Sequence, residues 1–416
     1  MLLCKVIYAQ LHERYRGRQF GGESMEIIFT ILFILAVVWG VGLLFERFGQ
    51  PLILGELLAG LVIGPSLLGL VGPPGAVFVW TPALDILATL GIFFLMFYAG
   101  LITDPKKLGK RVKTFFGVGI AGTLMPLLFG WLVTWFFTHD FWIALIMGLA
   151  ISGTSLVTKV RILGDLGILR SKVGYTMMGG AMVDNIFTFI ILAVVIKAIT
   201  VGIVGPLDVL YTMALVVAFF GIALFIGYRV YPRVRKLFVH PGARGFTFAL
   251  VMGLLIAGIG QIMGLHFIIG AYLAGLFVRE EFVGGAFRDL SRRFQTLSHG
   301  FLGPIFIVSV AFHVNFGVFE TYTLFLIVLI MAAIAGKVIG AGGGAYLTGL
   351  KKREALTIGI GMNGRGTVEL ILAMVGLEIG LLTDVHVSLL VFTAFATTFI
   401  TPIGLKYMLR KHLKKE

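Results

Sequence analysis

The sequence is poor in charged residues, which make up 13% of its 416 positions. Soluble domains usually contain about twice that share, roughly 25%. Hydrophobic residues account for 58% and the mean hydropathy is +1.02. A soluble domain of this length cannot hide so many apolar side chains, so its surface must itself be apolar. The composition therefore predicts an all-α, multi-pass membrane protein, and it argues against a soluble enzyme or a free nucleic-acid-binding protein.

Cysteine is nearly absent, because Cys4 is the single example. This excludes an intrachain disulfide and a cysteine-rich metal centre. His266 and His313, expected near the outer and central parts of their spans, favour helix packing or the outer mouth over metal binding. The glycine-rich GAGGGA after Lys337 has no strand before it, so it is not a dinucleotide-binding loop. We expect no resident cofactor and no enzymatic activity, since no nucleophile–base pattern is present.

Long hydrophobic runs are what the sequence does contain. A helical span needs about 20 mostly apolar residues. This criterion gives thirteen candidate spans, which are approximately 26–45, 52–70, 83–101, 114–138, 141–158, 173–200, 209–230, 245–263, 265–279, 299–317, 321–348, 355–380 and 385–407. The 56 glycines favour close helix packing in lipid over flexible linkers.

Basic residues are concentrated in every second loop, and they account for the net charge of +14 without a nucleic-acid partner. The basic loops are 102–113, 159–172, 229–244, 279–298, the turn at 351–353 and the C-terminal tail. The alternate loops contain no Lys or Arg. By the positive-inside rule the C-terminus is cytoplasmic, and thirteen spans then place the N-terminus outside, in the cell membrane.

The N-terminal segment disagrees with this topology. Residues 1–24 carry four basic side chains and lack the apolar run of a signal peptide, and Met25 begins a natural first span. We predict that residues 1–24 are a disordered or non-native extension. Residues 25–407 form the transmembrane domain, and residues 408–416 form a basic cytoplasmic tail.

Two pairs of spans resemble each other at an offset of seven spans. GELLAGLVIG at 55–64 resembles GAYLAGLFVR at 270–279, and spans five and twelve both carry Gly with Ser, Thr or Asn in LAISGTSLVTKV and IGIGMNGRGTVEL. A repeat displaced by an odd number of spans has inverted topology, which is typical of transporters. Irregular backbone at membrane depth must be buried in protein or line a wet cavity. We predict two inverted six-helix repeats with two crossing discontinuous helices.

Four ionisable residues lie deep within predicted spans. Each costs about 2.5–3.5 kcal/mol on insertion scales and so requires a reason. Arg365 and Glu369 are spaced i, i+4, which predicts an ion pair on one helix face that braces span twelve. Asp184 and Lys337 each lie 11 residues from the inner end of their spans. That places both about 16 Å deep, so we expect them to face each other.

The pair formed by Asp184 and Lys337 has two interpretations. It is either purely structural, or its buried carboxylate alternately binds a proton and a small cation. Competition for one site, combined with alternating access, is sufficient for cation/proton exchange. Asn185, Thr154 and Ser155, together with Ser152, offer neutral oxygens of the kind that Na⁺ prefers.

Several motifs, in order from Met25 to Lys406, resemble the cation:proton antiporter-2 family of NapA-type Na⁺/H⁺ and Kef-type K⁺/H⁺ exchangers. They are GQPLILGELLAGLVIGPSLLG, HFIIGAYLAGLFVRE, GPIFIVSVAFHVNF and IGIGMNGRGTVELILA. The resemblance implies a thirteen-span fold with interleaved dimer and core subdomains. It also implies that spans five and twelve are the crossing broken helices, and that the protein is a homodimer.

The resemblance also implies which residues form the functional site. VDNIFTFIILA matches the segment with the family's paired polar positions, so Asp184 occupies the first slot and Asn185 the second. The second slot normally holds the essential carboxylate, and the sequence departs from the family there. Lys337 matches the lysine that pairs with the first aspartate, and Thr154 falls at the break of span five.

We therefore predict a monovalent cation/proton antiporter with alternating access, with Na⁺ favoured over K⁺. One carboxylate and a permanently charged Lys337 predict one-for-one exchange. The first alternative is an organic-anion/Na⁺ symporter on the same fold. The second is a transport-impaired membrane sensor or partner-binding protein, because Asn185 replaces the usual aspartate. Expected partners are cations, protons and membrane lipids.

Overall fold

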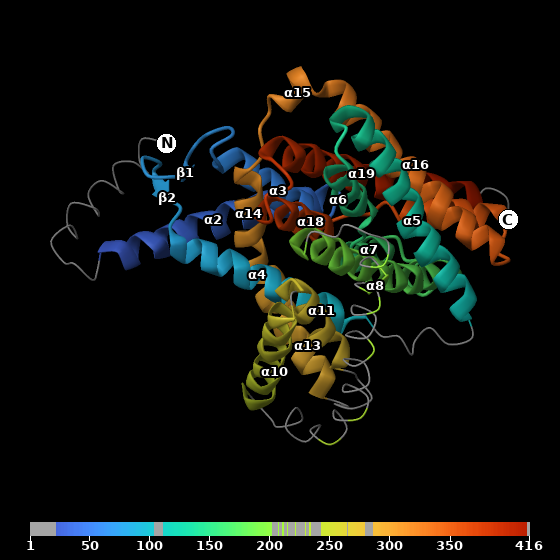
Figure 1. Cartoon of the computed structure of the whole chain (residues 1–416), viewed down its shortest axis with the longest axis horizontal. Helices are drawn as coiled ribbons and strands as arrows, with labels where there is room; N and C mark the ends of the chain where they lie inside the picture. Colours follow the sequence, from blue (N-terminus) through green and yellow to red (C-terminus); the bar gives the residue numbers. More distant parts are fainter. Residues whose placement is uncertain are drawn as a thin grey trace.

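The computed structural model describes residues 22–103, 111–201, 243–263, 265–278 and 286–413, with single positions between 207 and 233. The described chain is mostly helical, which confirms the predicted all-α membrane architecture (Figure 1). Its short β1 (Val71–Gly72) and β2 (Phe78–Val79) form one parallel pair beside the helices.

The first half of the chain contains seven described helices: α2 (Gly22–Arg47), α3 (Leu52–Ile63), α4 (Pro82–Leu101), α5 (Val112–Thr138), α6 (Phe141–Ser152), α7 (Leu156–Asp165) and α8 (Lys172–Val201). The second half contains α10 (Ala243–Ile262), α11 (Phe267–Phe277), α13 (Ala286–Leu297), the π-helical turn η2 (Ser298–Leu302), α14 (Gly303–Phe312), α15 (Val318–Thr321), α16 (Thr323–Leu347), α17 (Lys352–Gly361), α18 (Thr367–Glu378) and α19 (Asp384–Leu413).

Within the described residues, nine helical segments are long and apolar enough to cross a membrane, and α3 and α11 are shorter apolar helices. Span seven, at 209–230, lies almost wholly outside the described residues, as does the extension at 1–24. The count of thirteen spans and the inversion of the repeats therefore stay predictions. Helix contacts recur at the predicted offset, since α2 packs on α3 as α10 packs on α11, and α5 packs on α6 as α16 packs on α17.

Three span boundaries differ from the sequence prediction. Span two ends at Ile63 instead of 70, because Pro65 follows the last helical turn and 65–68 form turns. Span five continues to Asp165, so the predicted loop at 159–172 begins too early. Span ten starts within the predicted loop 279–298, because that loop contains the helix α13. This short helix buries Leu290 and Phe294 and also carries basic residues. A criterion of continuous hydropathy cannot find such an amphipathic helix.

The two histidines lie at helix ends. His313 follows the last residue of α14, against the prediction of a central position, and its Nδ1 lies 3.0 Å from Asp384 Oδ1. His266 precedes α11, with its Nε2 3.4 Å from Glu378 Oε2. Among the described residues no group of three or more His, Cys, Asp or Glu side chains is arranged to hold a metal ion.

The predicted discontinuous helices are confirmed. Span five is α6 and α7 with an extended break at 153–155, and span twelve is α17 and α18 with a break at 362–366. The breaks lie against each other, because the Ser155 N–H donates to the Gly364 carbonyl at 3.4 Å. The approach is close, because a Cβ at Gly366 would lie 3.0 Å from the Ser155 Cβ.

A stripe of glycines joins α16 to α5. Gly336, Gly340 and Gly344 recur every four residues and therefore share one face of α16. That face lies directly on the α5 backbone, since a Cβ at Gly340 would overlap the Ala121 carbonyl oxygen. Such small-residue stripes allow helix backbones to approach closely in lipid. Figure 1 shows α5 and α16 side by side over much of their length.

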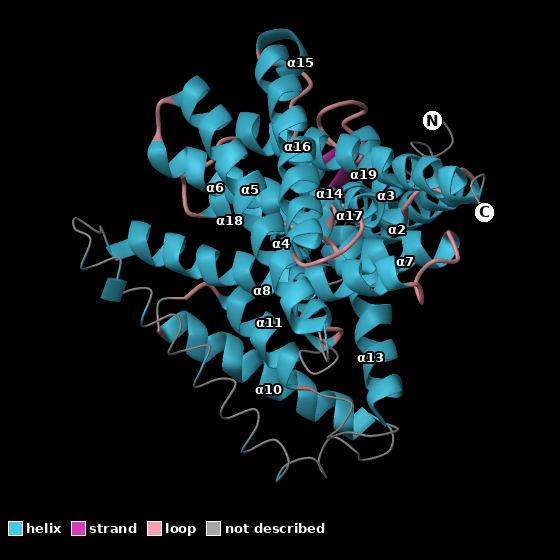
Figure 2. Cartoon of the chain, turned by 90° about the vertical axis from the view of Figure 1, so that its right-hand side faces the viewer, coloured by secondary structure: helices cyan, strands magenta, loops and turns pink. Residues whose placement is uncertain are grey.

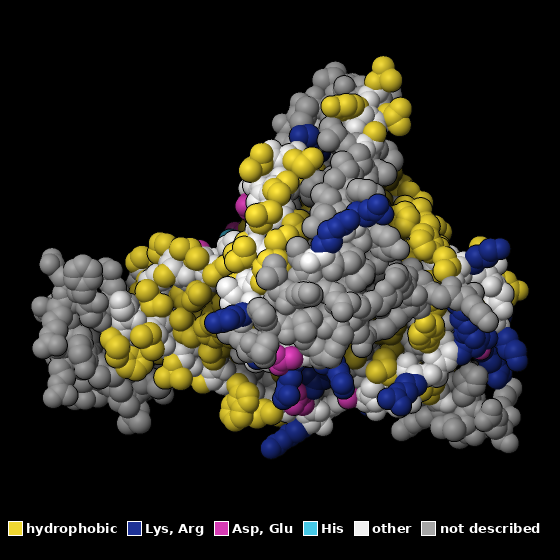
Figure 3. Space-filling model, turned by 90° about the horizontal axis from the view of Figure 1, so that it is seen from below, with side chains coloured by type: hydrophobic (Ala, Val, Ile, Leu, Met, Phe, Trp, Pro, Cys, Tyr) yellow, Lys and Arg dark blue, Asp and Glu magenta, His cyan; other side chains and the backbone are white. Residues whose placement is uncertain are grey.

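A second group of helices surrounds α4, which contacts α11, α13, η2 and α14. Figure 2 shows α10, α11 and α13 together, at the opposite end of the molecule from α15. The outer surface is strongly apolar, with Trp39 69% and Phe136 70% exposed. Figure 3 shows one such face, where hydrophobic side chains cover wide areas and Lys and Arg side chains gather in a few places.

Replacing Gly340 with Ala should separate α16 from α5, because the new methyl group would overlap backbone on a face without space. Overpacking of this kind costs about 1–3 kcal/mol. The matched control is Gly343→Ala, because nothing lies within 4 Å of a Cβ at Gly343. Thermal unfolding of the purified protein in detergent should show a lower Tm for Gly340→Ala alone. Equal Tm values for the two variants would contradict this account of the interface.

Candidate functional site

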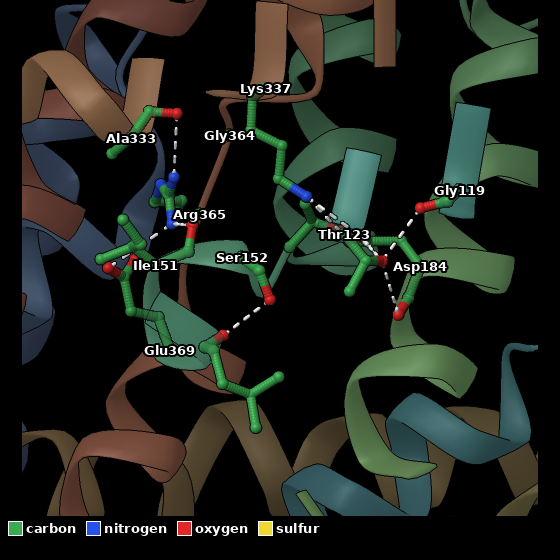
Figure 4. Close-up of polar contacts among 12 residues, drawn as sticks. Gly119, Thr123, Ile151, Ser152, Asp184, Ala333, Lys337, Gly364, Arg365 and Glu369 are labelled. Atoms are coloured by element: carbon green, nitrogen blue, oxygen red, sulfur yellow. Dashed lines mark hydrogen bonds and ion pairs between the residues drawn. The ribbon is translucent and has the colours of Figure 1, made fainter. Parts of the chain in front are cut away.

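Residues from four helical spans meet where the broken helices cross. Asp184 and Asn185 lie on α8, Lys337 lies on α16, Thr123 lies on α5, and Thr154 lies in the break between α6 and α7. Each of these side chains is buried, with at most 1% of its surface exposed. Figure 4 shows the Lys337 side chain directed at Asp184 beside Thr123.

The expected pair of opposite charges is present. Lys337 Nζ lies 3.0 Å from Asp184 Oδ1 and 3.2 Å from Oδ2, and both side chains are fully buried. An isolated charge at this depth would lose its hydration without compensation, whereas a hydrogen-bonded pair recovers part of that cost. The glycine stripe places Lys337 here, because Gly336 sits against Pro126 of α5 and brings the α16 backbone close to the site.

Two threonine hydroxyls complete the surroundings of the Asp184 carboxylate. Thr123 Oγ1 donates to Oδ1 at 2.5 Å, and Thr154 Oγ1 donates to Oδ2 at 2.6 Å. Thr154 was a candidate from the sequence, but Thr123 was missed. A polar residue four positions after Gly119 on the packing face of span four is a weak signal, because such threonines commonly bond their own helix backbone. Thr123 Oγ1 also lies 2.9 Å from the Gly119 carbonyl of its own helix, so its single proton is shared between that carbonyl and Asp184.

The side-chain oxygen of Asn185 receives no hydrogen bond in the described part of the chain. Its Oδ1 is buried and has no hydrogen-bond partner among the described residues, and Thr188 Oγ1, three residues further along α8, is in the same situation. Buried polar atoms normally find partners, so unpartnered oxygens require an explanation. Oxygens of this kind are suitable ligands for a hard monovalent cation.

The structure does not bring Ser155 or Ser152 to Asp184. The Ser155 hydroxyl caps α7, where it accepts from the Thr158 N–H at 3.2 Å and from Thr158 Oγ1 at 2.9 Å. The Ser152 hydroxyl donates to the Leu149 carbonyl in its own helix at 2.7 Å. Both hydroxyls satisfy the ends of the broken helix.

Arg365 and Glu369 pair at 3.6 Å, but not on one helix face as expected. Arg365 lies in the break before α18, and Glu369 lies in the first turn of α18. The Arg365 guanidinium also donates to the Ile151 carbonyl at the end of α6 and to the Ala333 carbonyl at 3.3 Å. Both groups are fully buried, and Figure 4 shows Arg365 between these carbonyls.

Lys159 is a third buried cation, although its sequence position predicts a loop. It is 1% exposed, and its Nζ donates to the Gly364 carbonyl at 3.0 Å. No carboxylate of the described chain lies within ion-pair distance of it. The two broken helices are thus joined reciprocally, since Lys159 of α7 binds the break of span twelve and Arg365 of that break binds the end of α6.

A cavity of about 580 Å³ lies beside the crossing but does not reach Asp184. Its walls come from α2, α3, α4 and the α13–α14 segment on one side and from α7, α8 and α18 on the other. Ser155, Thr158 and Thr367 line it at the helix breaks. Asp184 is 0% exposed and is not part of the lining, so the carboxylate is closed off from the cavity in this conformation.

The chain matches the model of the family described as "Sodium/hydrogen exchanger, transmembrane" over residues 30–411. It is 31% identical over 388 residues to the Na⁺/H⁺-K⁺ antiporter GerN of Bacillus cereus, covering 92% of this chain and 96% of that one. It is 29% identical over 391 residues to a Na⁺/H⁺ antiporter of Enterococcus hirae, covering 93% and 99%.

A solved structure supports the fold. The sodium proton antiporter MjNhaP1 from Methanocaldococcus jannaschii, at pH 8, superimposes with a TM-score of 0.67. The similarity covers 92% of this chain and 96% of that chain at 17% sequence identity.

Replacing Glu369 with Gln should destabilise the crossing, because Arg365 would remain as a buried charge without its carboxylate. Removal of one partner from a buried pair typically costs about 3–5 kcal/mol. Asp289→Asn is the matched control, since Asp289 and Arg293 form an exposed i, i+4 pair at 2.9 Å. An exposed pair contributes about 0.3–0.5 kcal/mol. Thermal unfolding should separate the variants clearly, and similar Tm values would show that the buried pair does not brace the crossing.

Proposed function

The chain belongs to the sodium/hydrogen exchanger family, and we propose that it exchanges Na⁺ or another monovalent cation for H⁺ across the membrane by alternating access. Asp184 is the group that binds the cation and the proton in turn. The alternation follows because one carboxylate cannot hold both at once. This makes the protein a secondary transporter driven by ion gradients.

The observation that carries the assignment is the environment of the Asp184 carboxylate. Lys337 and two threonine hydroxyls donate to it, so the site is built for a negative charge at membrane depth. An ionisable residue in that position is typical of ion pathways and proton relays. A purely structural pair would not need the neighbouring unpartnered oxygens of Asn185 and Thr188.

Lys337 acts as the built-in competitor of the transported cation. Its ammonium group contacts both carboxylate oxygens and compensates their charge when the site holds no cation. An arriving Na⁺ replaces that interaction with direct coordination. Because Lys337 keeps its charge throughout, one positive charge enters for each proton that leaves, and exchange is one-for-one.

Asn185 is a neutral ligand in the slot where relatives of this kind carry a carboxylate. Its Oδ1 and the hydroxyl of Thr188 would coordinate the cation beside Asp184, with Thr154 moving from donor to ligand. Small hard cations prefer such oxygen ligands, and we favour Na⁺ over K⁺ for this reason. Ser155, occupied as a helix cap, has no role as a ligand in this conformation.

The wider arrangement is also part of the proposal. We infer from the basic loops that the C-terminus lies in the cytoplasm and the N-terminus outside, with the protein in the cell membrane. The helices around α4 would hold the lipid-embedded dimer contacts, and the crossed helices would move as the core. The exposed apolar side chains of α2, among them Leu32 and Trp39, suit a lipid or helix–helix contact.

Asp184→Asn should abolish transport, because the amide can neither release a proton nor neutralise a cation. The measurement is dissipation of a preformed pH gradient in proteoliposomes on addition of Na⁺, Li⁺ or K⁺. Asp85→Asn is the control, since Asp85 lies in the first turn of α4 and accepts a hydrogen bond from the Trp80 indole, away from the site. Undiminished activity of Asp184→Asn would refute the assignment. A silent wild-type protein would instead favour the sensor alternative.

Asn185→Asp should make transport sensitive to membrane voltage. With two carboxylates the site carries one Na⁺ in one direction and two protons in the other. One net positive charge therefore crosses the membrane in each cycle. Flux is measured in proteoliposomes with and without a potential set by valinomycin and K⁺. We expect no response to potential in the wild type and at least a twofold change in Asn185→Asp. A voltage-dependent wild type would show that Lys337 also releases its proton.

A further inference from the structure

The cavity contains a carboxylate that the proposed exchange at Asp184 does not use. Glu56 lies one turn into α3, is only 5% exposed, and lines the cavity of about 580 Å³. No hydrogen bond or ion pair to its carboxylate is found among the described residues. A carboxylate buried to this extent is costly without a counter-charge or donor. The cavity that it lines is the available source of such a partner.

The other ionisable groups of the cavity have partners of their own. At the mouth, Arg161 of α7 forms an ion pair with Glu46 of α2 at 2.6 Å, and both are about one-third exposed, 33% and 39%. His299 lies with its Nδ1 2.8 Å from the Ser298 hydroxyl, and its ring packs against the Tyr98 ring. The Arg161 guanidinium is engaged by the Glu46 carboxylate. Glu56 is therefore the acidic group of this cavity that has no counter-charge in contact among the described residues.

The position of Glu56 links the cavity to the broken helices. Glu56 belongs to the wall formed by α3, and the wall from α7 and α18 presents the hydroxyl-bearing residues Ser155, Thr158 and Thr367. Those residues border the break that holds Thr154, which contacts Asp184. A cation in this cavity would thus share it with the Glu56 carboxylate and with Thr367, next to the break whose Thr154 contacts Asp184.

We propose that Glu56 forms a second binding site, which takes a partly hydrated monovalent alkali cation from the cavity before that cation passes to Asp184. A single carboxylate among neutral oxygens matches one positive charge, and the volume leaves space for the waters that such an ion retains. The passage to Asp184 rests on the proposed function, whereas binding at Glu56 does not. The site would supply the second carboxylate of the pathway, in a chain whose central site has Asn185 beside Asp184.

The test is equilibrium binding of ²²Na⁺ to the purified full-length protein in detergent. Asp184→Asn should remove the central site but retain a weaker Na⁺ site, with a Kd at least tenfold higher than the wild type. The double variant Asp184→Asn/Glu56→Gln should bind no Na⁺. If the double variant and Asp184→Asn bind Na⁺ equally, or if neither binds any, the Glu56 site is refuted. Asp85→Asn in the Asp184→Asn background is the control, because Asp85 does not line the cavity, and it should leave the weak site unchanged.

Transport gives an independent measurement. Glu56→Gln should raise the KM for Na⁺ at least threefold while kcat stays within a factor of two, because loading is impaired and the exchange step is not. A fall in kcat at constant KM would indicate a structural role and contradict the proposal. Loss of transport in Asp184→Asn tests the proposed function separately, so the two ideas can fail independently.

A measurement on the wild-type protein avoids any folding defect of the variants. A carbodiimide reacts with accessible carboxyl groups, and mass spectrometry locates the modified residue. Na⁺ should slow modification of Glu56 by at least threefold, whereas choline at the same concentration should not. Equal rates in Na⁺ and choline would overturn the proposal.

Discussion

The structure depends on the constraint that backbone polar groups at membrane depth must find partners within the protein. Two helices break at that depth, and each break exposes carbonyl and amide groups. The solution is reciprocal, since Lys159 donates to Gly364 in one break and Arg365 donates to Ile151 at the other. Each broken helix therefore stabilises the ends of its partner, and the crossing forms only when both are in place. Glu369 then balances part of the positive charge that this arrangement buries.

Glycine packing determines where the charges lie. The close approach of α16 to α5 brings both Lys337 and Thr123 to the Asp184 carboxylate, at 3.0 Å and 2.5 Å from its Oδ1. A larger residue in the stripe would move the ammonium group away from its partner. Interhelical hydrogen bonds in membranes are individually modest, about 0.6 kcal/mol on average in one measured system. The site therefore relies on several such contacts that are positioned by shape.

Much of this arrangement could be predicted from residue type and depth. Asp184 and Lys337 stood out because single opposite charges at equal depth have few alternatives to pairing. Thr123 and Lys159 could not be found in the same way. A threonine on a packing face has the same sequence signature whether it bonds its own backbone or a carboxylate. A lysine that follows a helix break is predicted to lie in a loop unless the helix is known to continue beyond the break.

The separation of Asp184 from the cavity has a mechanistic consequence. The carboxylate is fully buried, whereas the cavity ends at the residues that border the same break. In the proposed exchange, an ion that enters Asp184 from this cavity passes the break that holds Thr154, and opening there weakens a hydrogen bond to the carboxylate as the cation arrives to replace it. Opening without an incoming cation or proton would leave the carboxylate with fewer donors and is therefore disfavoured. Access to the site is thus linked to its occupation, and this link is what exchange requires in place of free leakage.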